Sequence, residues 1–513
     1  MPTAAAGGSV VHVGGWAAAA ETPAGLRYGS GAGRWVLVAM VLGSAIAAID
    51  ATVVGIALPA IGREFDAGLD TLQWVVTAYT LTLAGLLLVA GALGDRYGRR
   101  RVFLIGVVWF AVTSLLCGVA PSAPILIAAR ALQGVGAALL TPGSLAILQA
   151  SFVPGDRSKA IGAWSGLSGV ATALGPFLGG WAVQAASWRL IFVINLPIAA
   201  AVVALAWRNV PESHDSEATG RVDLTGGLLV TVGLVGLTYG LIEGSASGWS
   251  SPVVVAALTG GTVTLVTFVG WERRARSPML PLRLFSSTQF TATNLVTFVV
   301  YGALGGSLFL LPIQLQQVSG YTPLQAGVSL LPLTAIMLGL SAQSGALATR
   351  IGPRLQMSIG PTLVGTGLAL FTLVGPTGNY LTQVLPAVTV LGLGLATTVA
   401  PLTATALASA PARQAGTASA INNDVARIGA LIAVAVLPAA AGITGAAYLH
   451  PAQFSTGFHT ASLISGGLCM LGGVLAAVTI RNPHATAKRA DTAHRLHCSL
   501  DAPPTHAASS PHA

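Results

Sequence analysis

The segment GALGDRYGRR, residues 91–100, recurs in altered form as GALATRIGPR, residues 345–354, with six of the ten positions identical. Each copy closes an apolar run of about 20 residues, which is the length of an α-helix that crosses a bilayer. A second and weaker repeat pairs QGVGAALLTP, 133–142, with LGLGLATTVAP, 391–401. Repeats of this kind are typical of membrane proteins that are assembled from two related helical bundles.

The composition supports the same interpretation. Apolar residues make up 53% of the 513 residues and charged residues only 8%, and the mean hydropathy is +0.75. A soluble protein carries about 25% charged residues. The apolar runs lack the alternation of a β-barrel strand, and only helices or closed barrels satisfy their backbone in lipid. We therefore predict an all-α integral membrane protein.

Fourteen apolar runs can be counted, and they divide the chain into five parts. We expect a disordered tail over residues 1–33, a bundle of six helices over 34–209, a linker with two extra transmembrane helices over 210–288, a second six-helix bundle over 289–481 and a disordered tail over 482–513. The two extra helices are needed because the two copies of the first repeat are further apart than six helices require.

The basic residues fall on one side of this arrangement. Twenty-one of the 25 Lys and Arg residues lie in the tails and in the loops on the same side as the N-terminus, and only Arg63 and Arg189 lie in loops on the other side. Because cytoplasmic loops are rich in Lys and Arg, we predict a multi-pass protein of the cell membrane with both termini in the cytoplasm. The net charge of +9 therefore indicates a membrane face and not a nucleic-acid partner.

Signatures of metal and cofactor chemistry are missing from the sequence. The three cysteines, Cys117, Cys469 and Cys498, fit neither a disulfide framework nor a paired zinc spacing. The histidines of the C-terminal tail match no metal template. We expect no metal and no cofactor. We also do not expect an enzyme, because no catalytic side chains cluster near a membrane interface.

Asp50 stands out within AIDATVVGIALP, residues 48–59, because it interrupts an apolar run. Ionisable side chains inside a membrane helix are costly and are functional candidates by default. Arg130 is expected at a comparable depth on another helix. We predict that Asp50 takes up a proton and that Arg130 tunes it. A static buried ion pair is one alternative, and snorkelling of Arg130 toward the headgroups is another.

Asp424 and Arg427 are a second ionisable pair inside an apolar run, three residues apart in INNDVARIG, 421–429. That spacing allows a pair on one helix. The alternative is that Asn422, Asn423 and Asp424 line a central pocket. Glu243, at the end of another run, is expected near water.

Three motifs follow one another in the first half of the chain: GALGDRYGRRR (91–101), RALQGVGAA (130–138) and GVATALGPFLGG (169–180). Glycines in the first allow a tight turn, and Asp95 can accept hydrogen bonds from arginines. In the third, Gly175 and Gly179 form a small face for close helix contact, and Pro176 permits a bend. In this order the motifs resemble the major facilitator superfamily, in its fourteen-helix branch of drug–proton antiporters, from about residue 35 to 480.

The resemblance implies the major facilitator fold, with two six-helix bundles and two extra central helices. It also implies roles for three sets of residues. A conformational latch would comprise Gly91, Asp95, Arg96, Gly98, Arg99 and Arg100. The antiporter motif would comprise Gly169, Gly175, Pro176, Gly179 and Gly180. Proton coupling would involve Asp50, Arg130 and Asp424, and candidates for the substrate cavity are Gln73, Gln316, Asn422 and Asn423.

The sequence therefore predicts proton-coupled efflux of hydrophobic or amphipathic drugs or antibiotics, cationic ones included, by alternating access. We expect a monomer whose partners are the substrate, protons and the lipid bilayer. The alternative is a major facilitator importer, or an exporter of an ordinary metabolite. A receptor or a purely structural role has no support in the sequence.

Overall fold

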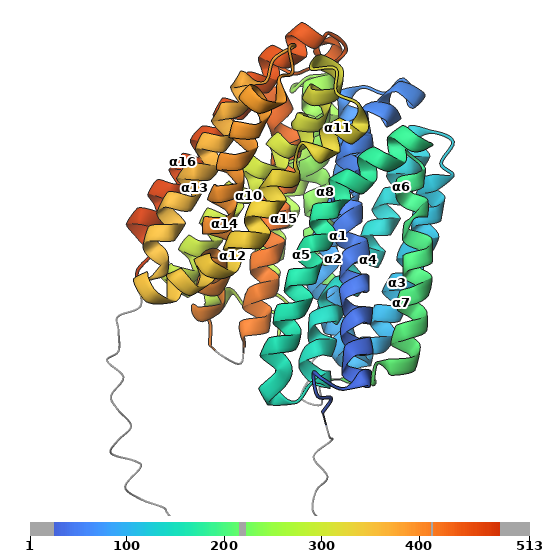
Figure 1. Ribbon diagram of the computed structural model, residues 1–513, viewed down its shortest axis with the longest axis vertical. Coiled ribbons are helices and arrows are strands. Elements are labelled where there is room, and N and C mark those ends of the chain that lie inside the picture. The colour runs from blue at the N-terminus through green and yellow to red at the C-terminus, as the bar shows by residue number, and fades with distance from the viewer. Residues whose placement is uncertain (1–24, 215–221, 412–413, 483–513) are drawn as a thin grey trace, which may run out of the picture.

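The computed structural model describes residues 25–214, 222–411 and 414–482, and nearly all of them lie in helices (Figure 1). In chain order the α-helices are α1 (Gly31–Phe65), α2 (Leu69–Tyr97), α3 (Arg99–Gly118), α4 (Ala123–Ser151), α5 (Pro154–Ala185), α6 (Leu190–Val193), α7 (Asn195–Asn209), α8 (Leu224–Ser247), α9 (Pro252–Glu272), α10 (Thr288–Ile313), α11 (Pro323–Val328), α12 (Leu331–Ile351), α13 (Pro353–Leu370), α14 (Leu385–Ala408), α15 (Ala415–Ala440) and α16 (Pro451–Thr479). Short helical turns extend or join them: η1 (Leu282–Ser286), η2 (Gln314–Val318), η3 (Phe371–Leu373), η4 (Tyr380–Val384) and η6 (Gly445–Leu449). Both described ends of the chain lie at one end of the molecule, which we call the terminal face, and the other end is the opposite face (Figure 1).

Among the described residues, 13 helical segments are long and apolar enough to cross a membrane. Four of them join two elements: α6 with α7, α10 with η2, α11 with α12, and η4 with α14. The fourteenth helix is α13, which packs between α14 and α16. Arg354 and Gln356 at its start lower its hydropathy. The structure therefore contains the fourteen predicted helices and is that of a multi-pass membrane protein.

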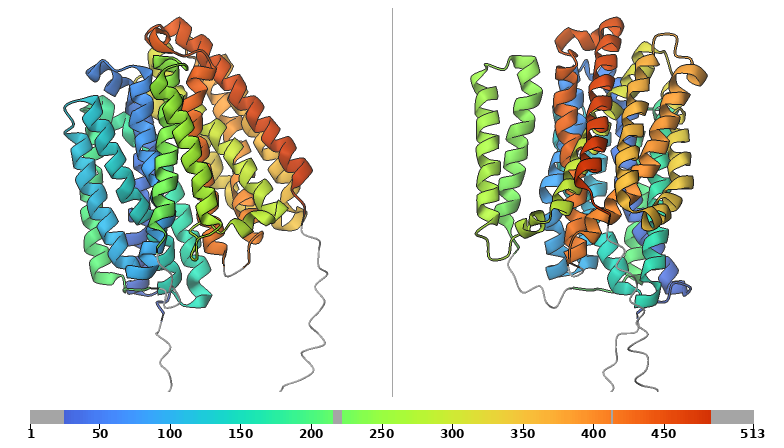
Figure 2. Two further views of the ribbon diagram at one scale, coloured as in Figure 1. Left: turned by 180° about the vertical axis from the view of Figure 1, so that it is seen from behind. Right: turned by 90° about the vertical axis from the view of Figure 1, so that its left-hand side faces the viewer.

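Helices α1–α7 form one bundle, α10–α16 form another, and α8 and α9 stand beside them as a pair (Figure 2). In the first bundle α4 packs against α2 and α3, while α1 packs against α5 and α7. In the second, α10 packs against α15 and α16. α8 and α9 pack mainly on each other, and α8 also contacts α2 and α15, one helix from each bundle. This is the predicted arrangement of two bundles with two extra helices.

The first helix begins earlier than expected. Gly31 starts α1, and the side chain of Ser30 caps it by accepting a hydrogen bond from the Gly33 amide. Before the cap, Leu26 forms a bridge with Phe152. The prediction that the N-terminal tail is disordered as far as residue 33 is therefore wrong for residues 25–33, because contacts with the distant α4–α5 turn hold them. The rest of that tail, and residues 483–513 of the C-terminal one, lie outside the described residues.

The internal repeat forms two equivalent turns. Gly98 joins α2 to α3 and Gly352 joins α12 to α13, with φ of 110° and 85°, values that favour glycine. A side chain three residues beyond the last helix of each bundle caps the helix after the turn. Glu212 Oε1 accepts from the Arg100 amide at 3.0 Å, and Asn482 Oδ1 accepts from the Arg354 amide at 3.0 Å.

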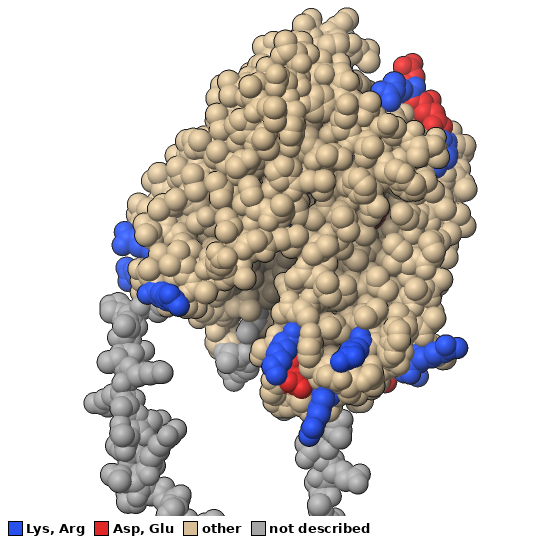
Figure 3. All heavy atoms as spheres, viewed as in Figure 1, with Lys and Arg blue, Asp and Glu red and all other residues tan. Residues whose placement is uncertain are grey.

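The two bundles touch in the half of the molecule near the opposite face. Gln316 Nε2 donates to the carbonyl of Ile56 at 2.9 Å, and Gly180 of α5 lies against Pro323 and Leu324 at the start of α11. Toward the terminal face the surface between the bundles is hollowed (Figure 3). Basic side chains lie around the rim of that face (Figure 3).

Candidate functional site

Asp50 and Arg130 meet inside the first bundle. Asp50 lies in the middle of α1 and Arg130 in the first third of α4, and each is 1% exposed. Arg130 Nη1 lies 2.5 Å from Asp50 Oδ2. The guanidinium therefore points into the protein, and the alternative in which it snorkels to the headgroups is wrong.

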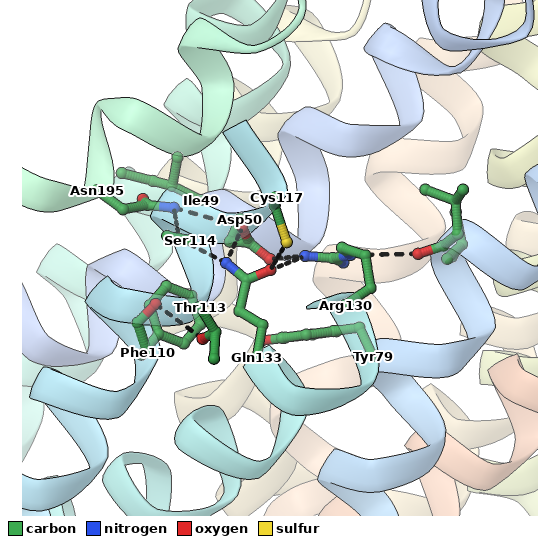
Figure 4. Close-up of polar contacts among 12 residues, drawn as sticks. Ile49, Asp50, Tyr79, Phe110, Thr113, Ser114, Cys117, Arg130, Gln133 and Asn195 are labelled. Carbon is green, nitrogen blue, oxygen red and sulfur yellow. Dashed lines mark hydrogen bonds and ion pairs between the residues drawn. The ribbon is translucent and has the colours of Figure 1, made fainter. Parts of the chain in front are cut away.

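Polar side chains of α3, α4 and α7 complete the cluster around Asp50 (Figure 4). Gln133 Nε2 donates to Asp50 Oδ1 at 2.9 Å and to Ser114 Oγ at 2.6 Å. Asn195, the first residue of α7, donates to Ser114 Oγ at 3.0 Å and to Asp50 Oδ1 at 3.4 Å. Like Arg130, these four residues are buried, with at most 1% of each exposed. We call Asp50, Ser114, Arg130, Gln133 and Asn195 the Asp50 cluster.

Arg130 has further partners besides the carboxylate. Its Nη1 donates to Gln133 Oε1 at 2.6 Å, and its Nε donates to the carbonyl of Val75 at 3.2 Å. Its guanidinium carbon lies 4.3 Å from the centre of the Tyr79 ring. A buried ion pair is tolerated only when additional hydrogen bonds satisfy the remaining polar atoms. These contacts provide that for the cation.

Sequence reasoning missed several members of this cluster. Gln133 follows Arg130 by three residues, so the spacing on one helix could have identified it. Asn195 is a polar residue at the start of an apolar helix, a place where an amide is as often structural as functional. Ser114 carries no signal, because single Ser residues are common in membrane helices. The structure also leaves two buried oxygens beside the cluster without a partner among the described residues: Tyr79 Oη and Asn195 Oδ1.

The predicted antiporter motif lies directly against the Asp50 helix. A Cβ at Gly175 would collide with Thr52 of α1, and a Cβ at Gly179 would come within 3.0 Å of the Val53 carbonyl. Thr52 and Val53 follow Asp50 by two and three residues. Only glycine allows α5 to approach α1 this closely.

The same motif also faces the second bundle. Gly180 touches the backbone of Pro323, and the carbonyl of Pro176 lies against Gly327 of α11. Gly169, nearer the terminal face, faces Leu338 of α12. α5 therefore contacts the Asp50 helix on one face and the other bundle on another.

Asp424 lies apart from the Asp50 cluster, on α15 of the second bundle. It is 7% exposed, and its Oδ1 has no hydrogen-bond partner among the described residues. Arg427 Nε also lacks one. The five ion pairs of the described residues do not include these two side chains. The pair on one helix, which the spacing allowed, is not formed.

The four candidates for the substrate cavity occupy different places. Gln73 is buried and donates to the carbonyl of Val434 at 2.6 Å, and Gln316 donates to Ile56; both contacts link the two bundles. Asn422 is buried between α15 and α10, where it donates to Asn294 Oδ1 and Thr297 Oγ1. Asn423 is exposed and donates to a backbone carbonyl of its own helix.

The residues of the predicted latch form contacts within the first bundle. Asp95 and Arg99, one turn apart, form an ion pair at 2.8 Å. Arg100 Nη1 donates to the carbonyl of Val210 at 2.9 Å. The Arg96 guanidinium lies 5.7 Å from the centre of the Tyr97 ring. Gly91 lies on α2, and Gly98 forms the turn described above.

Neither the Asp50 cluster nor the surroundings of Asp424 resemble a metal site. In the described parts of the chain, no three His, Cys, Asp or Glu side chains come together in a way that could hold a metal ion. Cys117 and Cys469 are buried free thiols.

Comparison with known proteins places these features in a family. The chain is 38% identical over 416 residues to the Multidrug resistance protein Stp of Mycobacterium tuberculosis (strain CDC 1551 / Oshkosh). The aligned region covers 81% of this chain and 77% of that protein. It is 36% identical to the Tetracenomycin C resistance and export protein of Streptomyces glaucescens, over 82% and 77% of the two chains. It is 35% identical to the Methylenomycin A resistance protein of Bacillus subtilis (strain 168), over 87% and 94%.

Solved structures show the same fold. A crystal structure of a peptide transporter, POT, in complex with sulfate aligns with a TM-score of 0.63 at 14% identity, over 86% of this chain and 93% of that one. A bacterial homologue of the lysosomal transporter Spinster, solved in an inward-facing conformation, aligns with a TM-score of 0.60 at 16% identity, over 87% and 96%. Residues 40–434 match the family model of the Major Facilitator Superfamily. The chain belongs to the Major Facilitator Superfamily.

Proposed function

We propose that this protein exports hydrophobic or amphipathic drugs or antibiotics across the cell membrane in exchange for protons. Relatives that align with most of the chain are named for multidrug resistance, for resistance to methylenomycin A, and for resistance to and export of tetracenomycin C. The observation that carries the proton coupling is the buried contact between Asp50 and Arg130. An ionisable group that a membrane protein keeps in its interior is a candidate for transport chemistry.

Asp50 is the group that takes up and releases the proton in this proposal. When the carboxylate is charged, it pairs with Arg130. When it is neutral, Arg130 keeps Gln133 Oε1, the Val75 carbonyl and the Tyr79 ring as partners. Breaking a buried ion pair usually costs about 3–5 kcal/mol because a charge is left alone. Here Arg130 keeps hydrogen-bond partners whether Asp50 is charged or neutral. Protonation of Asp50 therefore costs less free energy than breaking an ion pair whose cation has no other partner.

The small residues of α5 supply a route from the proton to the second bundle. Gly175 and Gly179 contact the turn of α1 that carries Asp50, and Gly180 contacts α11. Close-packed helices transmit small shifts instead of absorbing them. A rearrangement of α1 on protonation therefore changes how α5 meets α11, which is the contact that closes the molecule at the opposite face.

We further propose that the terminal face is cytoplasmic and that the protein works as a monomer. Basic side chains gather at this face, as they do on the cytoplasmic side of membrane proteins (Figure 3). In that orientation the hollow between the bundles opens to the cytoplasm, where a drug would enter. One chain supplies both bundles, so a single copy contains both sides of the hollow through which a drug would pass.

The test measures drug resistance and transport together. Expression in an efflux-deficient bacterial host is expected to raise the inhibitory concentration of at least one drug in a broad panel several-fold. Inverted vesicles from those cells should take up that drug only when a pH gradient is imposed. Asp50→Asn should reduce gradient-driven uptake at least tenfold while the protein remains in the membrane, because an amide cannot carry the proton.

Asp66→Asn is the matched control. Asp66 is exposed and ends α1 with φ of 48°, a conformation that Asn also tolerates. This variant should transport like the wild type. Gradient-driven uptake that is unchanged by Asp50→Asn would overturn the role of Asp50, and a panel in which no drug is exported would overturn the proposed function.

A further inference from the structure

Asp424 lines a cavity that is separate from the Asp50 cluster. The cavity has a volume of about 110 Å³, and its walls come from α2, α8, α9, α15 and the segment 279–285. In Figure 2, α8 and α9 stand at the side of the two bundles, and the chain that leads from α9 to α10 passes below them. The two extra helices thus close this cavity together with one helix from each bundle.

The walls of the cavity are apolar except for a single carboxyl group. Of the 12 lining residues, Asp424 is the only one that can ionise, and the others are apolar or glycine. Phe268 of α9 and Phe285 of η1 contribute aromatic rings. The Asp424 carboxyl is 7% exposed, and its Oδ1 has no partner among the described residues. A buried polar atom normally has a hydrogen-bond partner, so an unpaired one in a cavity points to a missing ligand.

Other charged groups on the surrounding helices do not neutralise Asp424. Arg427, one turn further along α15, is not within ion-pair distance of it in the described structure. Glu272 at the end of α9 and Asp223 at the start of α8 are acidic themselves. Glu272 Oε2 already accepts from the Leu280 amide, and Asp223 accepts from the Gly226 amide.

We propose that this cavity binds lipophilic organic cations. The positive group lies against Asp424, and the apolar part packs on Phe268, Phe285 and Leu88. Aromatic rings attract cations most strongly where water is excluded. In the empty cavity the carboxyl carries a proton, because an isolated carboxylate in an apolar site is costly. A cation that binds replaces that proton.

The position of the cavity fits a ligand that arrives through the lipid. Asp424 lies nine residues into α15, about 14 Å along the helix from the terminal face. Phe268 lies four residues before the end of α9 at the same face. Amphipathic cations collect in the headgroup region of a membrane, with their apolar part at this depth. Taking the bound cation as a transport substrate rests on the proposed function; the binding itself does not.

Binding can be measured on the purified full-length protein in nanodiscs of neutral phospholipid. The probe is benzyltrimethylammonium, which has a permanent charge and one aromatic ring. Calorimetric titration in two buffers of different ionisation heat counts the protons released. We expect saturable binding with release of up to one proton per cation. Asp424→Asn should weaken binding at least tenfold and abolish the proton release, while Asp424→Glu should retain both.

Two valines on α8 give a matched pair that separates the cavity from the helix surface. Val230 lines the cavity, whereas Val232 is 49% exposed on the same helix. Val230→Phe should fill the cavity and reduce binding as strongly as Asp424→Asn, and Val232→Phe should bind like the wild type. Equal binding by the wild type and Asp424→Asn, equal loss in both valine variants, or no binding by the wild type would each overturn the proposal.

Asp50→Asn separates this proposal from the proposed function. It should bind the cation normally, because Asp50 lies in another cluster of the first bundle. Binding that persists in a protein that exports no drug would leave this site standing and remove the transport proposal. Drug export without cation binding would remove the site alone.

Discussion

Asn195 carries an unused hydrogen-bond acceptor beside the Asp50 carboxylate. Its Nδ2 donates to Asp50 and to Ser114, but its Oδ1 is buried without a partner among the described residues. An unsatisfied buried acceptor costs about 1–3 kcal/mol. Asn195 is therefore a positioning residue, whose amide holds Asp50 and Ser114 together while its own oxygen stays unpaired in the described structure.

Asn195→Leu tests that inference. The substitution removes the amide that donates to Asp50 and to Ser114, so the carboxylate is held less firmly beside Arg130. Gradient-driven uptake in vesicles should therefore fall several-fold at an equal level of protein in the membrane. Asn209→Leu, at the end of the same helix, should leave uptake unchanged. Normal uptake by Asn195→Leu would show that this amide does not position Asp50.

At the scale of single residues, the sequence was informative wherever a residue type is rare. Asp50 and Arg130 could be singled out because charges seldom occur in apolar runs. Ser114 and Tyr79 could not, since such residues are common in membrane helices. Whether they face the carboxylate depends on the rotation of α3 and α2, which neighbouring helices set. Asp424 was also singled out for this reason. The cavity beside it could not be predicted, because it depends on how α8 and α9 pack against the bundles and no local sequence pattern reports that packing.

Among the elements, α5 has the most demanding contacts. It has glycine where α1 crosses it and again where α11 crosses it. A larger side chain at these crossings forces the helices apart, and overpacking of a tight interface costs about 1–3 kcal/mol. The same glycines that let α5 pack also connect Asp50 with the second bundle.

Gly175→Val should abolish transport and lower the thermal stability of the protein in detergent, because its side chain would meet Thr52. Gly166→Val provides the comparison on the same helix, since nothing lies within 4 Å of a Cβ at that position. It should keep both transport and melting temperature near those of the wild type. If both variants behaved alike, helix propensity and not the α1–α5 contact would account for the effect.

The elements themselves were largely predictable, because fourteen apolar runs of membrane-spanning length leave few alternatives. Their ends were not. α1 starts at Gly31 because Ser30 caps it and Leu26 pairs with Phe152 far along the chain. Likewise Glu212 and Asn482 cap the helices after the two repeated turns from positions outside the repeat. Contacts of this kind join distant segments, and local sequence patterns do not report them.

For the whole molecule, the decisive feature is where the two bundles meet. They touch near the opposite face through Gln73, Gln316 and the start of α11, and the surface between them is hollowed toward the terminal face (Figure 3). The internal repeat predicted two bundles but not which end is closed. That depends on a small difference in free energy between conformations with similar internal packing of each bundle.

Alternating access requires these contacts at the opposite face to open in each cycle, and a cross-link across them tests this. Gln184 of α5 is exposed, and its Oε1 accepts from the Leu324 amide of α11 at 3.4 Å. Cysteines at these two positions, in a Cys498→Ser background, can be joined by a short bifunctional thiol reagent with a reducible link, while Cys117 and Cys469 are buried. We expect the cross-link to reduce vesicle uptake of a transported drug at least tenfold and reduction to restore it. Each single-cysteine variant, treated with the same reagent, should transport normally. Full transport by the cross-linked protein would show that the bundles need not separate at this face.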